Sequence, residues 1–384
     1  MENNFNTIVA HYDEIGLKGK NQQFFVGKLI ENIKNIGSNL KVKRGEGKIV
    51  TEGTFEKEII ERLRLIPGIA NFAPAIACKT DLEKIKQSAL QIVNHYKPKT
   101  FKIETTRSYK PFELNSLELS REVGAYVLEN YKDKLKVDVH NPELLVKVEL
   151  AKEKTYILGK KEQGVGGLPV GATGKVVCLV SGGIDSPVAA FEVMKRGAKV
   201  IFVHFHNQTI NKKGVENKIK NIVRHLTQVQ GESRLYIIPF ADLQKQVITN
   251  IPADLRMIVY RRLMFQIAEQ IAKKENAKAL ITGDSLAQVA SQTLENMEVI
   301  YKATDMLKLA PLIGMNKTEI ISEAAKIGTY DISIEPYEDC CSLMIAKHPE
   351  TRANLEQVEK VEESLNVNDL VDNAIATTEV LVIR

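Results

Sequence analysis

The sequence predicts an α/β protein in which two small α+β domains precede a larger domain built on a doubly wound parallel sheet. Three observations lead to this fold class. The chain has 384 residues, enough for two or three domains of roughly 100–200 residues each. Its second half alternates short apolar runs with helical patterns, which is typical of a parallel sheet covered by helices on both faces. A glycine-rich stretch at residues 164–174 separates this half from the first.

The composition is that of an ordinary globular protein, with 44% hydrophobic and 26% charged residues. A net charge of +5, from 53 basic and 48 acidic residues, permits nucleic-acid binding without demonstrating it. Because we find no apolar run of about 18 residues and no basic-then-apolar leader, we expect a cytoplasmic protein without a membrane span. None of the four cysteines forms Cys-x-x-Cys, so we expect neither a zinc ribbon nor a disulfide framework.

The first small domain is predicted at residues 1–58. Strands at 7–10 and 48–50 flank an amphipathic helix at about 22–36. Between the first strand and the helix, residues 13–21 place two glycines and two lysines, Lys18 and Lys20, in one exposed loop. A solvated loop and an RNA contact explain this pattern equally well.

The second small domain is predicted at residues 59–163, with helices near 54–65 and 81–95 and strands near 100–106 and 144–150. Its basic residues gather around a loop at 108–112 that places two aromatic rings among cations, an arrangement that suits phosphates and an unpaired nucleotide. A charged solvent face is the competing explanation. The basic residues in question are Lys102, Arg107, Lys110 and Arg121.

The stretch at 164–174 holds five glycines and one proline in eleven residues and is predicted to be a linker without regular structure. The C-terminal domain then spans residues 175–384. Its strands are predicted at 176–180, 199–204, 234–238 and 279–282. In such sheets ligands bind outside the carboxyl ends of the strands, which here means near Ser181, His204 and Gly283. A long helix is predicted at about 254–274 and carries Arg261 and Arg262. Each of these arginines has two possible roles, contact with a phosphate or exposure to solvent.

The segment around which these predictions centre is Ser-Gly-Gly-Ile-Asp-Ser at 181–186, directly after an apolar strand. Gly182 and Gly183 let backbone N–H groups converge, and Pro187 suits the first turn of a helix whose N-terminus attracts anions. The predicted ligand is an oxyanion. A Walker loop is excluded, because the nearby Gly174-Lys175 lacks the following Ser or Thr. A glycine-rich turn without a ligand is the alternative.

This loop resembles the pyrophosphate loop (PP-loop) of ATP pyrophosphatases, and further segments resemble the tRNA 4-thiouridine synthetases within that group. Residues 13–21 are similar to the opening motif of these synthetases, and residues 283–293 resemble their second signature. Residues 101–104, 120–124 and 137–142 look like the THUMP domain, a module that grips the acceptor end of tRNA. The resemblance spans essentially all 384 residues. It implies a ferredoxin-like fold for the first domain, a THUMP fold for the second and a PP-loop ATP pyrophosphatase fold for the third.

The resemblance also implies a set of ATP-binding residues and a Mg²⁺ ion. Asp185 either holds this ion through oxygen ligands or water, with a catalytic role, or only caps the helix. No dedicated protein-built metal site is predicted. The implied nucleotide-binding positions are Leu179, Val180, Ser181, Gly182, Gly183, Asp185, Ser186, His204, Phe205, Arg261, Gly283 and Gln292.

Adjacent cysteines, Cys340 and Cys341, stand in a polar and acidic context, and the synthetases carry their catalytic cysteine in this region. Spacing from the second signature favours Cys340 as the persulfide carrier, although a chance pair explains the residues equally well without the resemblance. Because the sequence shows no rhodanese-like domain, we expect the two thiols to divide sulfur delivery and resetting between them. Cys178, inside an apolar strand, is predicted to be structural.

The resemblance implies a tRNA uracil 4-sulfurtransferase. ATP activates the 4-oxygen of uridine 8 as an adenylate, and persulfide sulfur, loaded by a cysteine desulfurase, displaces AMP. Two alternatives stay open: another PP-loop enzyme that modifies RNA or forms an amide, and an RNA-binding protein with a degenerate ATP site. The sequence also leaves open whether the protein supplies sulfur for thiamine synthesis and whether it is a homodimer.

Overall fold

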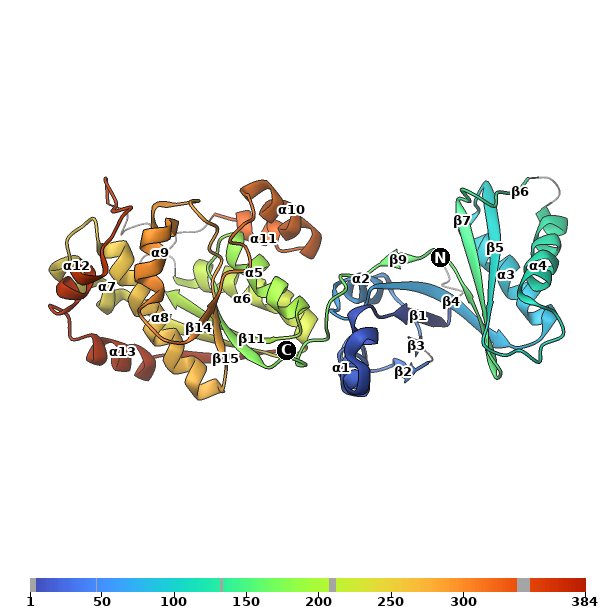
Figure 1. Ribbon diagram of the computed structural model, residues 1–384, viewed down its shortest axis with the longest axis horizontal. Helices are drawn as coiled ribbons and strands as arrows, with labels where there is room; N and C mark the ends of the chain where they lie inside the picture. The colour runs from blue at the N-terminus through green and yellow to red at the C-terminus, as the bar shows by residue number, and fades with distance from the viewer. Residues whose placement is uncertain (1–4, 46, 132–133, 207–211, 337–345) are drawn as a thin grey trace. The chain divides into compact units, whose positions relative to one another are not determined.

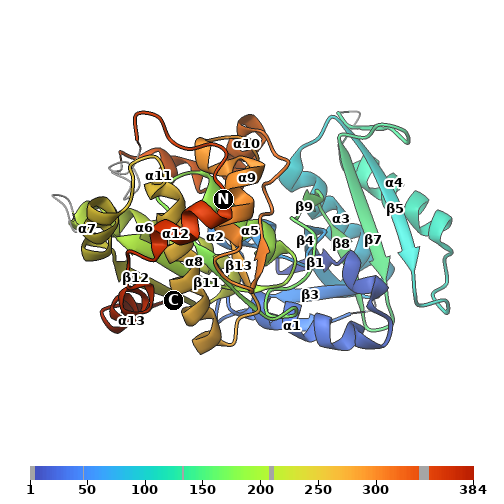
Figure 2. The same cartoon turned by 60° about the vertical axis from the view of Figure 1, so that its left-hand side comes forward.

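The computed structural model describes residues 5–45, 47–131, 134–206, 212–336 and 346–384. The chain divides into two compact units, Met1–Leu168 and Pro169–Arg384, which are called here the N-terminal unit and the C-terminal unit. Both contain helices and strands (Figures 1 and 2). Within the described residues, no helix is long and apolar enough to cross a membrane.

The N-terminal unit is built on one nine-stranded sheet, ordered β2-β3-β1-β4-β8-β7-β5-β6, with β9 paired to β4. Its strands are β1 (Thr7–His11), β2 (Lys41–Arg44), β3 (Lys48–Glu52), β4 (Asn71–Lys79), β5 (Thr100–Arg107), β6 (Lys136–Val137), β7 (Leu144–Leu150), β8 (Lys154–Leu158) and β9 (Glu162–Gln163). Its helices are the 3₁₀ helix η1 (Glu14–Asn21), α1 (Gln22–Lys34), α2 (Lys57–Leu65), α3 (Leu82–Tyr96) and α4 (Ser116–Tyr131).

The first part of this unit has the β-α-β-β-α-β order of a ferredoxin-like fold, as predicted. Local sequence explains the elements of the second part. Along β5, Phe101, Ile103 and Thr105 are buried in alternation with more exposed residues, so one face of the strand packs against helices. The carboxylate of Asp81 accepts a hydrogen bond from the Lys84 backbone N–H at 3.0 Å and caps the start of α3.

The C-terminal unit is built on a six-stranded sheet with the order β14-β13-β10-β11-β12-β15. The strands are β10 (Lys175–Leu179), β11 (Lys199–His206), β12 (Ser233–Pro239), β13 (Ala279–Ile281), β14 (Leu307–Leu309) and β15 (Glu379–Ile383). The helices are α5 (Asp185–Lys195), α6 (Lys212–Gln230), α7 (Ala241–Asn250), α8 (Arg256–Glu275), the 3₁₀ helix η2 (Ala290–Gln292), α9 (Leu294–Tyr301), α10 (Lys317–Ile327), α11 (Tyr330–Ile334), α12 (Leu355–Glu362) and α13 (Val367–Ala376).

The first five strands of this sheet are parallel, which confirms the predicted doubly wound class, and β15 adds one antiparallel edge strand. Helices α5 and α6 pack against β10, β11 and β12, while α8 packs against β10 and β13. The chain order reverses at β10, whose neighbours are β11 and β13. The carboxyl end of β10 is therefore the switch point at which ligands bind in such sheets.

The predicted linker is ordered by hydrogen bonds to both sides. Gly166 exchanges backbone bonds with the 68–69 segment of the N-terminal unit, and Gly171 donates to the Gly197 carbonyl of the C-terminal unit at 2.8 Å. A Cβ atom at Gly164 would lie 2.3 Å from the Ile69 oxygen, so glycine is required there for close packing. The division between compact units falls inside the stretch, after Leu168. The boundaries at 58/59, 163/164 and 174/175 stay predictions.

Candidate active site

The loop after β10 bends back on itself before α5 begins. The Val180 backbone N–H still donates to the Val203 carbonyl, at 2.8 Å, so the sheet holds the loop up to its first serine. The Ser181 N–H then donates to Ser186 Oγ at 2.8 Å, and the two hydroxyl oxygens lie 3.2 Å apart. Because α5 starts within this turn, at Asp185, its N-terminal N–H groups face the loop, as expected for an oxyanion site.

Glycines around this loop serve different purposes. A Cβ atom at Gly283 would lie 2.8 Å from the Ser186 backbone nitrogen, so glycine lets the chain after β13 pass close to the start of α5. At Gly183 a Cβ would meet only Ser181 Oγ, at an ordinary 3.5 Å. Packing against the protein therefore does not require glycine at position 183, and its small size leaves room for a ligand.

A cavity of about 590 Å³ opens at this point. Ten of the twelve implied nucleotide-binding residues line it, whereas Gly182 and Gly183 lie in the adjoining loop without lining it. Eight lining residues were not predicted to bind a ligand. The complete lining is Leu179, Val180, Ser181, Asp185, Ser186, His204, Phe205, Met257, Arg261, Met264, Thr282, Gly283, Asp284, Val289, Ala290, Ser291, Gln292 and Pro349.

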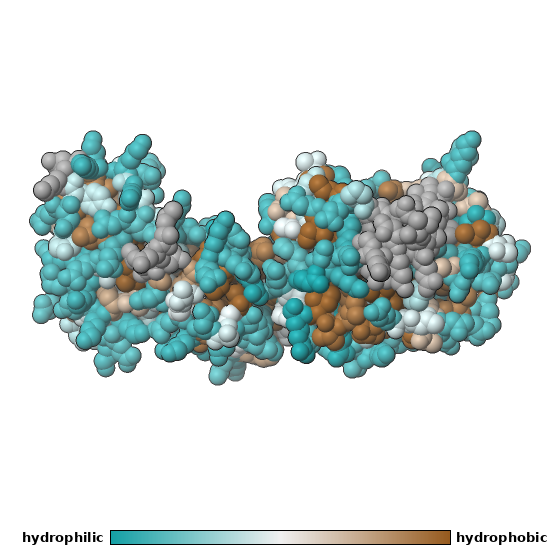
Figure 3. Space-filling view, turned by 180° about the vertical axis from the view of Figure 1, so that it is seen from behind, coloured by the Kyte–Doolittle hydropathy of each residue, from teal (hydrophilic) through white to brown (hydrophobic). Residues whose placement is uncertain are grey.

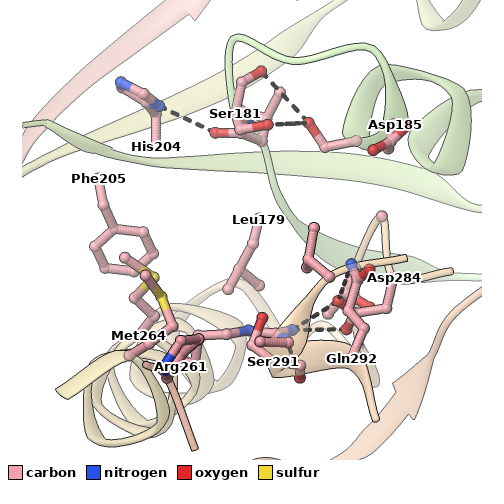
Figure 4. Close-up of a pocket in the computed structure, with 18 residues that line it drawn as sticks. Leu179, Ser181, Asp185, His204, Phe205, Arg261, Met264, Asp284, Ser291 and Gln292 are labelled. Atoms are coloured by element: carbon pink, nitrogen blue, oxygen red, sulfur yellow. Dashed lines mark hydrogen bonds and ion pairs between the residues drawn. The ribbon is translucent and has the colours of Figure 1, made fainter. Parts of the chain in front are cut away.

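The cavity has two chemically different sides. Figure 4 shows Ser181 and Asp185 on one side, and Arg261 with Gln292 on the other. Phe205 and Met264 contribute apolar surface between them, and Met257 of α8 also lines the cavity. An apolar wall beside an anion-binding helix end is the combination that a purine nucleotide needs.

Asp284 organises the side opposite the loop. Its buried carboxylate accepts two hydrogen bonds from Arg261 Nη2, at 2.8 and 2.7 Å, and others from Gln292 Nε2 at 3.0 Å and Tyr301 OH at 2.9 Å. Burial alone would raise the pKa of Asp284, but the Arg261 guanidinium and these donors lower it. Burial and the Asp284 charge in turn raise the pKa of Tyr301.

This network orients the polar groups that face the cavity. The Gln292 side-chain amide donates an N–H to Asp284, whereas its buried Oε1 has no partner among the described residues. Such an acceptor is costly unless a ligand donates to it. Because Asp284 neutralises Arg261, the pair adds little net charge to the cavity.

The neighbouring Arg262 corrects one sequence-based expectation. Instead of reaching a phosphate or facing solvent, its buried guanidinium forms two hydrogen bonds with Glu362 of α12, at 2.7 and 2.9 Å. A further bond of 2.7 Å goes to the Val299 carbonyl. One residue along a helix turns a side chain by about 100°, so Arg262 faces away from the direction of Arg261.

Both oxygens of Asp185 are engaged. Lys317 Nζ, at the start of α10, lies 2.5 Å from Oδ1, and Gln288 Nε2 donates to Oδ2 at 2.9 Å. The capping alternative is also wrong, because the helix N-cap is Ile184 and Asp185 already lies in the first turn. Lys317 was not predicted from the sequence, since no motif joins positions so far apart.

Mg²⁺ requires a set of oxygen ligands, which the Asp185 carboxylate alone does not complete. Within the described ranges, no group of three or more His, Cys, Asp or Glu side chains is placed to hold a metal ion. The site supplies one carboxylate at the phosphate-binding loop. This fits an ion held mainly by phosphates and water, and it does not fit a cage built by protein alone.

The six predicted RNA-binding cations lie in the N-terminal unit but on several elements. Lys18 and Lys20 belong to η1, and the Lys18 ammonium lies 5.3 Å from the centre of the Phe25 ring. Arg107, at the end of β5, donates to the Leu114 and Lys110 carbonyls and so braces its own loop. The remaining positions are Lys102 on β5, Lys110 in the following loop, and Arg121 on α4.

A second cavity, of about 630 Å³, is lined by residues of β1, β2, β3, β5, β7 and β8 of the same unit. Arg107 is the one predicted cation that lines it. Five further cations surround it, and three acidic residues, including Glu52 and Glu149, partly balance their charge. These five were not predicted from the sequence, because they come from β2, β3, β8 and the segment between β7 and β8: Lys43, Arg44, Lys48, Lys152 and Lys154.

The structure describes two of the four cysteines, Cys78 and Cys178. Cys340 and Cys341 lie outside the described residues, and their predicted roles stay predictions. Cys178 is fully buried in β10, and burial raises the pKa of its thiol to about 12, which suits a structural residue. Cys78 is half-buried, and burial raises the pKa of its thiol as well.

Comparison with known proteins matches three parts of the chain to family models. Residues 171–367 match the family model described as thiamine biosynthesis protein (ThiI), residues 79–158 match the THUMP domain, and residues 7–73 match the ThiI ferredoxin-like domain. A Bacillus licheniformis protein named probable tRNA sulfurtransferase is 42% identical, over 98% of this chain and 95% of its own length. A protein of the same name from Caldanaerobacter subterraneus is 44% identical, over 95% and 97%.

Solved structures extend the likeness to three dimensions. The crystal structure described as a 4-thiouridine synthetase–RNA complex with bound ATP is 37% identical, with a TM-score of 0.93 over 99% of this chain and all of the other. A Pyrococcus horikoshii protein, PH1313, is 23% identical with a TM-score of 0.65 over 84% of this chain, and it shows the fold alone. The family model covers half of the sequence and the relatives cover nearly all of it, so the chain belongs to the ThiI family, with a ferredoxin-like domain and a THUMP domain before its PP-loop domain.

Proposed function

We propose that this protein is an ATP-dependent tRNA sulfurtransferase that converts uridine 8 of tRNA to 4-thiouridine. The observation that carries the proposal is the Ser-Gly-Gly-Ile-Asp-Ser loop at the switch point, which opens into a cavity with the size and polarity for ATP. Relatives that match nearly the whole chain are named tRNA sulfurtransferases, and the structural match holds ATP and RNA.

ATP lies with its phosphates at the loop and its adenosine against the apolar wall. Backbone N–H groups of residues 181–186 and the N-terminus of α5 bind the pyrophosphate portion. Lys317, which forms an ion pair with Asp185 at the same end, brings its ammonium N–H donors beside the phosphates. Phe205 and the two methionines contact the base, and the free Gln292 Oε1 accepts a hydrogen bond from the nucleotide.

The first step activates the uridine. Its O4 attacks the α-phosphorus of ATP, the bond from that phosphorus to the bridging oxygen breaks, and pyrophosphate leaves. Loop N–H groups stabilise the charge that develops on the departing oxygen, an effect worth about 3 kcal/mol for each well-placed donor. The product is an O4-adenylate. The uridine oxygen alone is a poor leaving group, whereas in the adenylate it leaves as part of AMP, which is a good one.

The second step brings in sulfur. The terminal sulfur of a Cys340 persulfide attacks C4, a C–S bond forms, and the C–O bond breaks as AMP leaves with its electron pair. The Cys341 thiolate then attacks the Cys340 sulfur, which releases 4-thiouridine and leaves a disulfide. A reducing thiol opens this disulfide before the next cycle.

The remaining assignments concern partners and cofactors. We propose that the N-terminal unit binds tRNA through its basic residues, and that a cysteine desulfurase in the cytoplasm supplies the persulfide. Asp185 would hold a Mg²⁺ ion that shields the phosphate charge. A homodimer and a contribution of the same persulfide to thiamine synthesis are further proposals, the latter suggested by the family description.

The test is pyrophosphate release by purified protein given ATP, Mg²⁺ and a tRNA transcript. We expect release that depends on the transcript, and a loss of about 100-fold in Ser181→Ala and Asp185→Asn. Mass spectrometry of the tRNA nucleosides, after loading with a cysteine desulfurase, should detect 4-thiouridine.

Cysteine variants separate the two steps. The Cys340→Ser variant should still release pyrophosphate and form no 4-thiouridine. The Cys341→Ser variant should transfer sulfur to C4 and then fail to release 4-thiouridine from Cys340. Full thiolation by both variants would disprove the cysteine assignment. Pyrophosphate release that does not depend on the presence of tRNA would disprove the proposed tRNA sulfurtransferase function.

A further inference from the structure

The two oxygens of the Asp185 carboxylate have partners of different kinds. Lys317 Nζ lies 2.5 Å from Oδ1, and Gln288 Nε2 donates to Oδ2 at 2.9 Å. An ionised carboxylate only accepts hydrogen bonds, so the amide nitrogen of Gln288 is the atom that faces Asp185. The Lys317 side chain is 46% exposed and flexible, and its ammonium can move from Oδ1 to a phosphate. The Gln288 amide is neutral and has no such attraction to phosphate.

The chain after β13 brings Gln288 back to Asp185, although 103 positions separate them in the sequence. Gly283 starts this return, since a Cβ atom there would lie 3.0 Å from the Asp185 carbonyl carbon. Ala287 has a φ of +61°, which is unfavourable for a residue with a side chain, and its N–H is held by the Gln292 carbonyl at 2.8 Å. Such strain persists where the surroundings fix the backbone, and it clusters at ligand sites.

The other end of the Gln288 amide is costly to the fold. Its Oε1 is buried and has no hydrogen-bond partner among the described residues. A buried acceptor without a donor destabilises the folded state, and an apolar side chain of the same length would avoid that cost. Stability therefore disfavours glutamine at position 288, and the contact with Asp185 is what explains it.

Gln292 has the same arrangement on the opposite side of the cavity. Its Nε2 donates to Asp284 Oδ1 at 3.0 Å, and its buried Oε1 has no partner in the part of the chain that the structure describes. Figure 4 shows Asp185 at the start of α5, and Asp284 with Gln292 across the cavity. Each glutamine therefore fixes one aspartate, but only Gln288 does so at the phosphate-binding loop.

Occupation of Oδ2 changes what the carboxylate of Asp185 offers to a cation. While Gln288 holds Oδ2, only Oδ1 becomes available when Lys317 moves to a phosphate. Mg²⁺ requires near-ideal octahedral geometry, whereas Ca²⁺ also accepts both oxygens of one carboxylate. A carboxylate that presents a single oxygen therefore suits Mg²⁺ better than Ca²⁺.

We propose that Gln288 is a positioning residue that leaves Oδ1 of Asp185 as the one oxygen available to the Mg²⁺ ion of MgATP, and that it thereby sets a preference for Mg²⁺ over Ca²⁺. The inference rests on the ATP site of the proposed function, and it requires neither RNA nor sulfur. Partners of this kind, which orient a metal ligand without touching the metal, typically change metal affinity by about 10–100-fold when they are replaced.

The experiment measures the affinity of the full-length protein for ATP by calorimetric titration, without a divalent ion and with saturating Mg²⁺ or Ca²⁺. The test variant is Gln288→Met, which keeps the length of the side chain and removes the amide. Its affinity for ATP without a divalent ion should match that of the parent. The gain in affinity on adding Mg²⁺ should shrink by about 10-fold. The gain with Ca²⁺ should shrink less, because Oδ2 is then free for a second contact.

Thermal unfolding of the same variant gives an independent readout. Gln288→Met removes a buried acceptor without a donor, so its melting temperature should equal or exceed that of the parent. A residue retained only for stability would give the opposite sign. Asp185 keeps its second partner, Lys317, in this variant.

Two further glutamines serve as matched controls. Gln292→Met should weaken ATP binding by the same factor with and without Mg²⁺, because Gln292 lies across the cavity from the loop. Gln266, on α8, also has a buried Oε1 without a partner among the described residues, and it does not line the cavity. Gln266→Met should therefore keep the parent affinity and both metal gains, and it reports the effect on stability alone.

Each result decides between explanations. A smaller Mg²⁺ gain in Gln288→Met alone, with a lowered preference for Mg²⁺ over Ca²⁺, supports the inference. An unchanged Mg²⁺ gain, an equal fall of both metal gains, or a parent protein that gains nothing from Mg²⁺ overturns it. A parent that binds MgATP with this preference and forms no 4-thiouridine removes the proposed function and leaves the role of Gln288 standing.

Discussion

Glu149 shows how one residue can balance the charge of a basic surface. Its carboxylate is buried in β7, forms an ion pair with Lys48, and lies 3.6 Å from His11 Nε2 and 3.5 Å from Lys147 Nζ. Burial alone would raise its pKa, but His11 and Lys48 outweigh burial and lower the pKa from 4.5 to about 2. The folded N-terminal unit therefore favours the ionised form.

This shift predicts a specific loss of stability in acid. Because the folded pKa lies below the unfolded value, the stabilisation is complete above pH 4.5 and is lost as the pH falls towards about 2. Its size is about 3 kcal/mol at neutral pH. Urea unfolding of the parent and Glu149→Gln, followed by circular dichroism between pH 2 and 7, should show a gap that closes in acid. A gap independent of pH would contradict the charge argument.

Asp284 supports a second prediction at the residue scale. Asp284→Asn leaves the Arg261 guanidinium without its carboxylate, and removing one partner of a buried ion pair costs about 3–5 kcal/mol. Tyr301→Phe removes only one hydrogen bond to the same carboxylate and should cost about 1.5–3 kcal/mol. Calorimetric titration with ATP should show weaker binding for both, more so for Asp284→Asn. Equal affinity for ATP in the parent and both variants would mean that the hydrogen bonds to Asp284 do not orient nucleotide-binding groups.

At the scale of elements, the start of α10 sets the position of Lys317. A capping box closes this helix: Asn316 Oδ1 accepts the Glu319 N–H at 3.0 Å, and Glu319 Oε2 accepts the Asn316 N–H at 2.8 Å. Lys317 is the first helical residue and reaches Asp185 from there. The cap therefore connects helix stability to the charge at the phosphate end of the cavity.

Removing this cap should affect both properties. Asn316→Ala is expected to cost about 1 kcal/mol and to slow pyrophosphate release, because the first turn that carries Lys317 frays. Asn354 caps α12 through the Glu356 N–H at 2.9 Å, so Asn354→Ala is a matched control with a similar loss of stability. Thermal unfolding and the pyrophosphate assay measure the two effects. If the two variants lose the same activity, the cap does not act through Lys317.

At the scale of the whole molecule, charge is divided between the compact units. The N-terminal unit has 28 basic and 22 acidic residues, whereas the C-terminal unit has 25 and 26. The entire positive excess thus belongs to the N-terminal unit, and the face drawn in Figure 3 shows predominantly hydrophilic residues over it. Contacts with phosphates supply most of the non-specific affinity for RNA, so the N-terminal unit should provide most of this affinity.

Separate fragments test this division. Residues 1–168 and 169–384 each contain their own sheet and core, so both should fold. We expect the first fragment to bind a tRNA acceptor stem within about tenfold of the full chain, with affinity that falls steeply as salt rises. The second should bind ATP and little RNA. Fluorescence anisotropy at two salt concentrations measures this, and equal RNA binding by both fragments would refute the assignment.

The sequence by itself determined the elements whose signals are local. The apolar runs at β10 to β13 and the glycine loop at 181–186 specify strand, turn and helix through neighbouring residues, and family motifs supplied most of the cavity lining. Short or exposed elements such as β2, β14 and β15 were not predicted, because three to five residues carry little periodic signal.

Only the tertiary structure decided which distant side chains meet. Lys317 on Asp185, Asp284 between Arg261 and Gln292, and Asn296 between Ala290 and Glu350 join positions up to 132 residues apart. Such contacts follow from how strands order in a sheet and how helices pack on it, and no local pattern encodes them. Arg261 and Arg262 illustrate the difference: adjacent in sequence, they face a cavity and a buried glutamate, since a helix turns successive side chains apart.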